Sequence, residues 1–395
     1  MLQTIAIRGY RSLRDVVLPL RRLTVVTGAN GTGKSSLYRA LRLLADCGRG
    51  EVIGSLAREG GLESVLWAGP EQLSGARRTG RVEGTTRTAP VALELGFASD
   101  DFGYLVDLGM PQMAGHKSLF TLDPEIKREV VFAGALMRRG STLVKRTRDY
   151  VEASSEAVTG FEEVSRSLPS HRSVLAEYAH PGAHPELAAV RHRLRTWRFY
   201  DGFRVDAAAP SRLPQVGTRT PVLSDDGRDV AAAVQTILEA GFDDFGHAVA
   251  DAFDGASVSV AVHDGLFDLA LQQKGMLRPL RAAELSDGTL RFLLWAAALC
   301  SPQPPSLMVL NEPETSLHPD LLRPLASLIA SAARLTQVVV VTHSKAMLQF
   351  LGTTSIADAE ADTAAVELPL YKDLGETRIE GLGMLTAPPW DWGKR

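Results

Sequence analysis

The strongest constraint on the fold of this chain is a glycine-rich segment near its amino terminus, residues 24–36. Four of its residues match the phosphate-loop pattern G-x-x-x-x-G-K-S/T: Gly28, Gly33, Lys34 and Ser35. A strand-like apolar stretch precedes it, and leucines follow it at helical spacing. A chance glycine-rich turn would not be expected to have both neighbours. The segment therefore predicts a strand, a phosphate-binding loop and a helix.

The chemistry of this loop follows from its residue types. Glycines let backbone N–H groups face phosphate oxygens, which larger side chains would block. Lys34 would reach the β- and γ-phosphates, and the Ser35 hydroxyl would hold Mg²⁺. A helix expected from about Ser35 to Ala45 points its positive end at the anion. The residues expected to contact the nucleotide here are Asn30, Gly31, Thr32, Gly33, Lys34, Ser35 and Ser36.

Composition restricts the class of protein further. The chain has 395 residues, enough for two domains or one large α/β domain with an insertion. Its net charge of -3 gives no overall attraction to nucleic acid, so any such contact must come from local patches. The two cysteines, Cys47 and Cys300, fit buried free thiols in a reducing compartment. We see no signal peptide or membrane-spanning run and expect a cytoplasmic protein with no membrane partner.

Two strand-like segments, residues 2–8 and 15–18, precede the phosphate loop and flank a Gly-Tyr-Arg-Ser turn. This opening resembles the SMC/RecF-like branch of ABC-type ATPases, in which an aromatic-Arg/Lys-Ser segment precedes the nucleotide loop. The resemblance implies that Arg11 and Ser12 lie against the nucleotide. A simple polar turn is the alternative. The cofactors implied by the family are ATP and Mg²⁺.

A second motif, Glu-Leu-Ser-Asp-Gly-Thr at 284–289, precedes an apolar helix expected at 290–300. It resembles the ABC signature LSGGQ, with Asp287 in place of a glycine, and implies that Ser286, Asp287 and Gly288 bind a γ-phosphate at a helix end. In the family this motif binds the ATP of the opposite subunit, which implies a homodimer with two shared sites. Taken alone, Ser-Asp-Gly before a helix is a common N-cap.

The apolar run 306–310 ends in Asn311-Glu312-Pro313-Glu314, which resembles a Walker B strand followed by a catalytic glutamate. By that resemblance Glu312 orients the attacking water. Asn311 stands where the family usually has Asp. Its amide can accept a hydrogen bond from a Mg²⁺-bound water but brings no negative charge. The affinity for the metal and the rate of turnover are therefore not expected to follow the family directly. His343, after a strand expected at 336–341, resembles the switch histidine that bonds the γ-phosphate. Lys34, Glu312 and His343 are thus the expected catalytic residues, and Ser35 and Asn311 the expected metal ligands.

The motif order predicts an α/β ABC-ATPase head: a mixed sheet with the phosphate-loop helix, an antiparallel β subdomain and a helical lid insertion. We place the amino-terminal half at 1–130, a mainly helical insertion at 131–210 and the carboxyl-terminal half at 211–395. No sustained heptad is present, which excludes a long SMC arm. Too little chain follows His343 for the TOPRIM nuclease domain of OLD-type relatives.

Periodicity also locates ordinary elements outside the motifs. The expected strand pairs are 91–97 with 104–108, 256–262 with 266–271 and 366–371 with 377–379, and the expected helices are 227–240 and 245–253.

Several residues keep two interpretations. The segment 186–204 interleaves arginines with aromatic residues, which suits nucleic acid, but an amphipathic helix with Leu194 and Trp197 packed inward is favoured. A glutamine that contacts Mg²⁺ in the family has two candidates, Gln72 and Gln112. A group of loop arginines could touch phosphate or be solvated: Arg77, Arg78, Arg81 and Arg87. Trp390 and Trp392 could dock on a partner or on the body of the protein.

The function expected is ATP binding and hydrolysis with ATP-dependent homodimerisation, coupled to DNA binding, repair or recombination. The alternative is an ATP-gated switch that recruits or licenses a separate effector protein, for example in anti-phage defence, with slow hydrolysis because of Asn311. A binding module with a degenerate site is the third possibility, and the intact Lys34, Ser35 and Glu312 argue against it.

Overall fold

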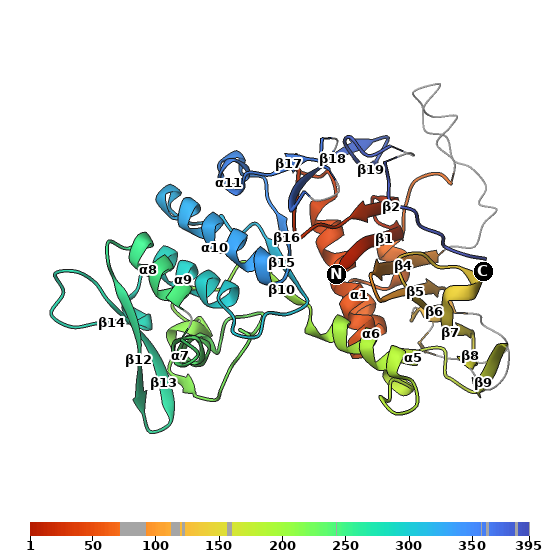
Figure 1. Ribbon diagram of the computed structural model, residues 1–395, viewed down its shortest axis with the longest axis horizontal. Helices are drawn as coiled ribbons and strands as arrows, with labels where there is room; N and C mark the ends of the chain where they lie inside the picture. The colour runs from red at the N-terminus through yellow and green to blue at the C-terminus, as the bar shows by residue number, and fades with distance from the viewer. Residues whose placement is uncertain are drawn as a thin grey trace. The chain divides into compact units, whose positions relative to one another are not determined.

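A computed structural model divides the chain into two compact units (Figure 1). It describes residues 1–71, 92–111, 119–120, 123–155, 160–241, 243–356, 358–360, 363–383 and 386–394. Unit 1 comprises Met1–Arg21, Gly28–Thr196 and Leu368–Arg395, and unit 2 comprises Arg22–Thr27 and Trp197–Glu367. The chain passes between the units four times, and two of these crossings lie inside strands, β3 (Leu23–Gly28) and β18 (Ala365–Asp373).

Unit 1 contains an antiparallel sheet whose described strands run in the order β2-β1-β4-β5-β6-β7-β8-β9. The strands are β1 (Leu2–Tyr10), β2 (Leu13–Pro19), β4 (Ala92–Ser99), β5 (Phe102–Gly109), β6 (Glu125–Ala133), β7 (Thr142–Thr147), β8 (Tyr150–Ser155) and β9 (Gly160–Ser165). Two-residue turns join β1 to β2, β4 to β5 and β7 to β8, and in the β4–β5 turn the Ser99 hydroxyl bonds both the N–H and the carbonyl of Phe102. Such turns allow sequential strands to pair directly.

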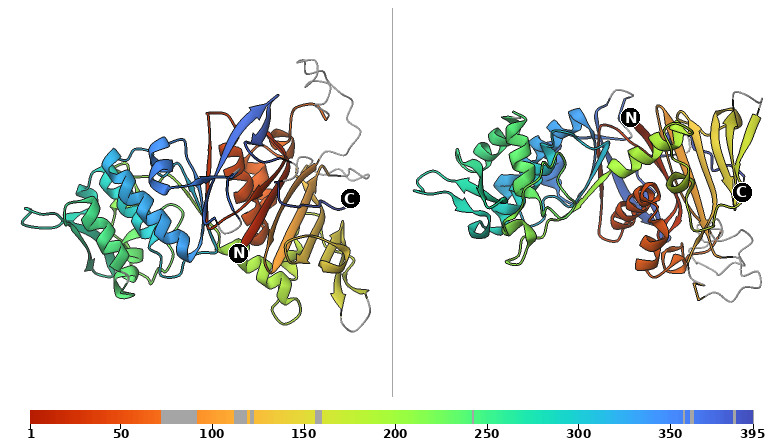
Figure 2. Two further views of the ribbon diagram at one scale, coloured as in Figure 1. Left: turned by 45° about the horizontal axis from the view of Figure 1, so that its top comes forward. Right: turned by 90° about the horizontal axis from the view of Figure 1, so that it is seen from below.

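Helices pack on one face of this sheet. They are α1 (Lys34–Arg49), α2 (Val52–Arg58), α3 (Leu62–Val65), α5 (Val174–Glu177) and α6 (Pro185–Thr196). Helices α1 and α6 pack against each other (Figure 2). A Cβ at Gly48 would lie 2.5 Å from the Cβ of Leu194, so this close helix approach requires a glycine.

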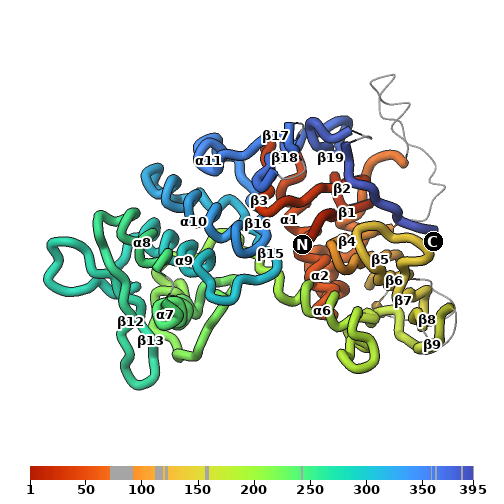
Figure 3. Tube along the Cα trace, in the orientation of Figure 1, coloured from red at the N-terminus to blue at the C-terminus, as the bar shows by residue number. Residues whose placement is uncertain are grey.

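The carboxyl-terminal tail covers part of the other face of the sheet (Figure 3). Trp392 is buried among Ala6, Leu105 and Phe132, and the ring of Trp390 packs edge-on against Phe132. The tail tryptophans therefore dock on the body of this chain.

Unit 2 is built on a parallel sheet. Strands β10 (Arg198–Asp201), β15 (Leu307–Asn311), β16 (Gln337–Val341) and β3 lie in that order. Strands β15 and β16 are nearly continuous apolar runs that are buried along their length, as expected for parallel strands covered on both faces. Since all four are parallel, their carboxyl ends lie at one edge, where Val26, Asn311 and Val341 are near neighbours.

The remaining elements of unit 2 form one core with this sheet. The helices are α7 (Val230–Glu239), α8 (Asp243–Ala252), α9 (Asp287–Leu299), α10 (Leu322–Leu335) and α11 (Lys345–Leu351). A second small sheet holds β11 (Gln215–Val216), β12 (Ser257–His263), β13 (Leu266–Gln272) and β14 (Leu280–Arg281), and β17 (Thr354–Ser355) pairs with the start of β18. Helices α7 and α8 lie between α9 and the β12–β13 hairpin. None of the described helices is long and apolar enough to cross a bilayer.

The elements named from periodicity are confirmed, among them the β12–β13 hairpin and the helices α7, α8 and α9. The turn between β12 and β13 places Asp264 and Gly265 at positive φ, as its sequence predicts. The mainly helical character expected for 131–210 is wrong. That stretch holds the end of β6 and all of β7, β8 and β9. In β7 and β8 the buried residues recur at every second position, as in a half-buried strand. Pro and Gly at 181–185 interrupt the remaining helical part, which forms α5 and α6. The three domain boundaries stay a prediction.

Candidate functional site

The phosphate loop has the backbone conformation that its glycines permit. Gly28, Gly31 and Gly33 all have positive φ, at 143°, 81° and 113°. A Cβ on Gly28 would lie 2.5 Å from the carbonyl oxygen of Leu370, and one on Gly33 would lie 2.3 Å from Thr377 Oγ1. Helix α1 begins directly after the loop, and its N-cap residue, Gly33, has no side chain that could cap the first N–H groups. These donors are therefore available to an anion.

Lys34 is held inside the loop by carbonyl oxygens. Its ammonium donates to the carbonyl of Gly28 at 2.6 Å and to that of Ala29 at 3.2 Å, and the residue is only 6% exposed. Asn30, Gly31 and Ser35 are exposed on the same loop. The buried cation and the exposed hydroxyl match what a bound phosphate and its metal require.

Two hydroxyl groups from outside the loop support it, one from a strand and one from the turn between β1 and β2. Thr377, on β19 (Glu376–Ile379), donates from Oγ1 to the carbonyl of Thr32 at 2.7 Å, and its oxygen lies 2.8 Å from Ser12 Oγ. A hydroxyl donates only one hydrogen, so Ser12 donates to Thr377. Ser12 thus lies in the layer that supports the loop.

Arg11 is engaged away from the loop. Its guanidinium forms an ion pair with Glu59 at 2.7 Å, and the Tyr10 hydroxyl donates to the same carboxylate at 2.6 Å. Burial raises the pKa of Tyr10 well above its usual range, and the Glu59 carboxylate raises it further. The backbone of Arg11 has a φ of 49°. Its contact with a nucleotide stays a prediction.

The expected catalytic pair lies at the carboxyl edge of the parallel sheet in unit 2. His343 Nδ1 lies 3.4 Å from Glu312 Oε1. The N–H of Glu312 donates to the carbonyl of Val341 at 2.8 Å, which ties the ends of β15 and β16 together. Glu312 has a φ of 46°, a strained conformation of the kind found at functional sites.

A second carboxylate, that of Glu314, contacts the segment that carries His343. Its Oε1 accepts from the Thr342 hydroxyl and from the N–H of His343 at 3.4 Å, while His343 Nδ1 lies 3.8 Å away. The Glu314 side chain is 8% exposed. Two carboxylates thus face one imidazole, an arrangement that fixes the ring orientation.

Asn311, the expected metal ligand, makes an unexpected contact. Its amide nitrogen donates to Asp201 Oδ1 at 2.7 Å, and the two residues are direct neighbours in the β10–β15 register. The described residues contain no cluster of His, Cys, Asp and Glu that could hold a metal alone. A serine hydroxyl and an amide oxygen are each ligand types that Mg²⁺ accepts, since it takes few protein ligands and relies on phosphates and water. The metal-binding roles of Ser35 and Asn311 stay a prediction.

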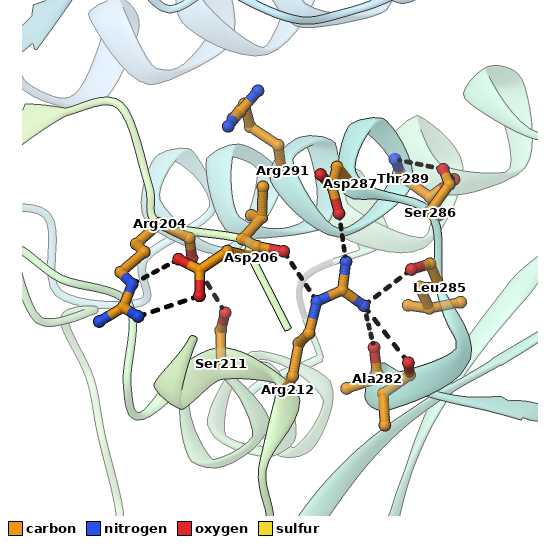
Figure 4. A network of polar contacts seen from close by, with 12 residues as sticks. Arg204, Asp206, Ser211, Arg212, Ala282, Leu285, Ser286, Asp287, Thr289 and Arg291 are labelled. Carbon is orange, nitrogen blue, oxygen red and sulfur yellow. Dashed lines mark hydrogen bonds and ion pairs between the residues drawn. The ribbon is translucent and has the colours of Figure 1, made fainter. Parts of the chain in front are cut away.

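The signature segment is held by one buried arginine (Figure 4). Arg212 donates to the carbonyls of Val205, Ala282 and Leu285 at 2.8–3.0 Å and to Asp287 Oδ1 at 2.5 Å. The side chain is only 7% exposed, whereas that of Asp287 is 67% exposed. The aspartate that departs from the family pattern therefore has a partner in this chain.

Ser286 and Gly288 open α9. Ser286 is its N-cap and accepts from the N–H of Thr289 at 3.2 Å. Around a Cβ built on Gly288, the described chain places only Ser316 O within 4 Å, at 3.9 Å. Gly288 thus has no steric reason within the described residues to be glycine, which leaves room for a ligand to approach.

The other candidates have simpler outcomes. Leu194, Trp197, Phe199 and Tyr200 are buried, as the packing interpretation of 186–204 expects, so these rings are not available for base stacking. The expected helix is too long, since α6 ends at Thr196 and residues 198–201 form β10. Arg193 bonds Asp101 at 2.9 Å. The two glutamines and the loop arginines lie outside the described residues: Gln72, Gln112, Arg77, Arg78, Arg81 and Arg87.

Comparisons with known proteins agree with this geometry. Residues 23–348 match the family described as "AAA domain, putative AbiEii toxin, Type IV TA system". The chain belongs to this family. No curated protein matches it. The resemblance to ABC-type ATPases of the SMC-like group is confirmed at the level of the fold by the solved structures described next.

Solved SMC heads share the fold at low identity. An SMC head bound to the C-winged helix domain of ScpA is 13% identical with a TM-score of 0.50, over 97% of this chain and 98% of that one. The Pyrococcus furiosus head, bound to the C-terminal domain of ScpA, is 12% identical with a TM-score of 0.51, over 98% and 97%. The Thermotoga maritima head is 13% identical with a TM-score of 0.47, over 97% and 99%. The two heads with TM-scores of 0.50 and 0.51 confirm the expected α/β fold of a head. A helical lid is not confirmed, since the stretch expected to form it is largely β.

Motif reasoning missed four supporting residues: Asp201, Arg212, Glu314 and Thr377. Only Glu314 carried a signal, since it lies two residues after Glu312. The other three contact residues that are far away in the sequence, and no local sequence pattern predicts such contacts.

Proposed function

We propose that this chain binds MgATP and hydrolyses it, with two copies enclosing two nucleotides. The observation that carries the proposal is the phosphate loop. Three glycines of positive φ lead into an uncapped helix, with the buried Lys34 ammonium held by the loop carbonyls. Family membership supports ATP as the nucleotide. Calorimetry with ATP and Mg²⁺ tests binding, and phosphate release tests turnover.

The catalytic roles follow from the residues of each unit. Lys34 would exchange its carbonyl partners for phosphate oxygens. Ser35 and Asn311 would hold Mg²⁺, which would supply positive charge against the phosphates when bound. Glu312 would accept a proton from the attacking water, and His343 would donate to the γ-phosphate. The Glu312–His343 contact of 3.4 Å keeps the base and the donor together.

The proposal of a homodimer depends on the signature. Ser286 and Asp287 are exposed, and Gly288 has open space in the described chain. A γ-phosphate from a second copy would meet the N-terminus of α9 there, and each chain carries one signature. Light scattering with and without ATP tests this state.

We further propose that the ATPase cycle is coupled to DNA, as inferred from the SMC/RecF-like motif set. The aromatic residues of 197–200 are buried and cannot contribute, so the DNA contact would involve other surfaces. ATPase activity with single-stranded, duplex and nicked DNA tests the coupling, and stimulation by one form supports it. A cytoplasmic location is part of the same proposal.

A second candidate is an ATP-gated switch that recruits an effector protein. Two observations favour it. Asn311 lacks the usual charge, which would slow hydrolysis and prolong the ATP-bound state, and the family description names a toxin system. Lack of DNA stimulation together with slow turnover and a long-lived ATP-bound dimer would favour the switch.

A further inference from the structure

An acidic side chain that belongs to none of the motifs lies beside the end of the Walker B strand. Strand β10 is the parallel neighbour of β15, and its last residue, Asp201, is registered opposite Asn311. The Asn311 amide nitrogen donates to Asp201 Oδ1 at 2.7 Å. The two polar groups therefore form one pair at the carboxyl edge of the sheet.

This contact determines what the pair can offer to a ligand. Because the amide nitrogen of Asn311 is used by Asp201, its amide oxygen is left as an acceptor. Asp201 is exposed, and its second oxygen accepts no hydrogen bond from the described residues. The pair carries one negative charge, as a single aspartate at 311 would.

We propose that Asp201 supplies the charge that Asn311 lacks and accepts a hydrogen bond from a water molecule on the nucleotide's Mg²⁺. The inference rests on the proposed MgATP binding. A residue that hydrogen-bonds a metal-bound water or a metal ligand typically contributes to metal affinity, and its mutation lowers that affinity by about 10–100-fold. In this chain the acidic function of the Walker B position is thus divided between two strands.

The competing explanation is structural: the bond could merely join β10 to β15. Asp201→Asn separates the two, since an amide oxygen still accepts the hydrogen bond from Asn311 but the charge is gone. The double variant Asp201→Asn/Asn311→Asp keeps both the charge and the bond, with donor and acceptor exchanged. Asp206→Asn is the matched control, because Asp206 is an exposed aspartate of the same segment, paired with Arg204.

The experiment measures the affinity of the full chain for a fluorescent, non-hydrolysable ATP analogue, with Mg²⁺ titrated and separately in EDTA. For Asp201→Asn we expect a Mg²⁺ midpoint about tenfold higher or more, with unchanged affinity in EDTA. The double variant should return the midpoint to within about threefold of the parent, and Asp206→Asn should not move it. Melting temperatures verify folding.

Two results would overturn the inference. One is an unchanged Mg²⁺ midpoint in Asp201→Asn. The other is a raised midpoint that the double variant, folded as the parent is, does not restore. If the parent chain binds no analogue with or without Mg²⁺, the proposed function fails, and that outcome is distinct because it precedes any comparison of variants.

Discussion

Thr377 donates a hydrogen bond to the carbonyl of Thr32, 345 residues earlier in the chain. The phosphate loop is therefore shaped by a strand near the carboxyl terminus as well as by its own glycines. The fit is close, since a Cβ on Gly33 would lie 2.3 Å from the same hydroxyl. Strand β19 is a structural part of the nucleotide loop.

The first prediction concerns this hydroxyl. Thr377→Val should leave the Thr32 carbonyl without its buried partner, at a cost of about 1–3 kcal/mol in the free energy of unfolding. Nucleotide affinity should fall as the loop loosens. Thr377→Ser keeps the hydroxyl and serves as the control. Denaturation and calorimetry measure both effects, and equal behaviour of the two variants would contradict the role of the hydrogen bond.

Lys34→Ala should remove nucleotide binding while the fold persists. The ammonium now held by the Gly28 and Ala29 carbonyls is the cation expected to meet phosphate. Hydrogen bonds to charged groups contribute roughly 1.5–3 kcal/mol each, so the affinity loss should exceed tenfold. Calorimetry with ATP is the measurement. An unchanged dissociation constant would refute the assignment of the phosphate loop.

Glu312→Gln should bind ATP but hydrolyse it at least about a hundredfold more slowly, because the amide cannot accept a proton. The ATP-bound dimer should then accumulate. Phosphate release gives the rate, and light scattering with ATP gives the mass. A variant that stays monomeric at saturating ATP would count against two chains sharing the nucleotide.

Arg212→Ala should disturb the signature segment. Removing the guanidinium leaves the carbonyls of Ala282 and Leu285 and the Asp287 carboxylate without this donor. We expect lower melting temperature, and turnover reduced more strongly than ATP affinity, since the phosphate loop is untouched. Arg204→Ala is the control because Arg204 is exposed and pairs only with Asp206 in the described network. Equal losses in both variants would show that Arg212 has no particular role.

The two thiols should react slowly in the native protein. Burial raises the pKa of Cys300 to about 12 and that of the fully buried Cys47 well above its usual range. Both are thus protonated at pH 8, while in the unfolded chain a sizeable fraction is thiolate. The free energy of unfolding should accordingly fall as the pH rises above 8.5, the ordinary thiol value. Thiol titration with an aromatic disulfide reagent, with and without denaturant, measures the difference; rapid native reaction would contradict it.

Sequence patterns of a few residues predicted the structural features that depend on neighbouring residues alone. The phosphate loop, the α9 N-cap and the β12–β13 turn each depend on a few consecutive residues, and each is found where expected. The strands β8 and β9 were missed because two-residue alternation competes with nearby helical spacing over a short window.

The supporting contacts could not be predicted for a different reason. Asp201 meets Asn311 only because β10 pairs with β15, and Arg212 reaches Asp287 across 75 positions. Neither partner has a sequence neighbour that reveals the pairing. Composition and spacing therefore located the nucleotide motifs but not the residues that hold them in place.

The passage of the chain through β3 and β18 means that neither unit is one uninterrupted stretch of polypeptide. A gene fragment that ends anywhere before Glu367 would therefore truncate both units at once. Nicking the connection at Thr196–Trp197 should likewise leave two pieces that stay associated, because β3 and β18 still thread through both.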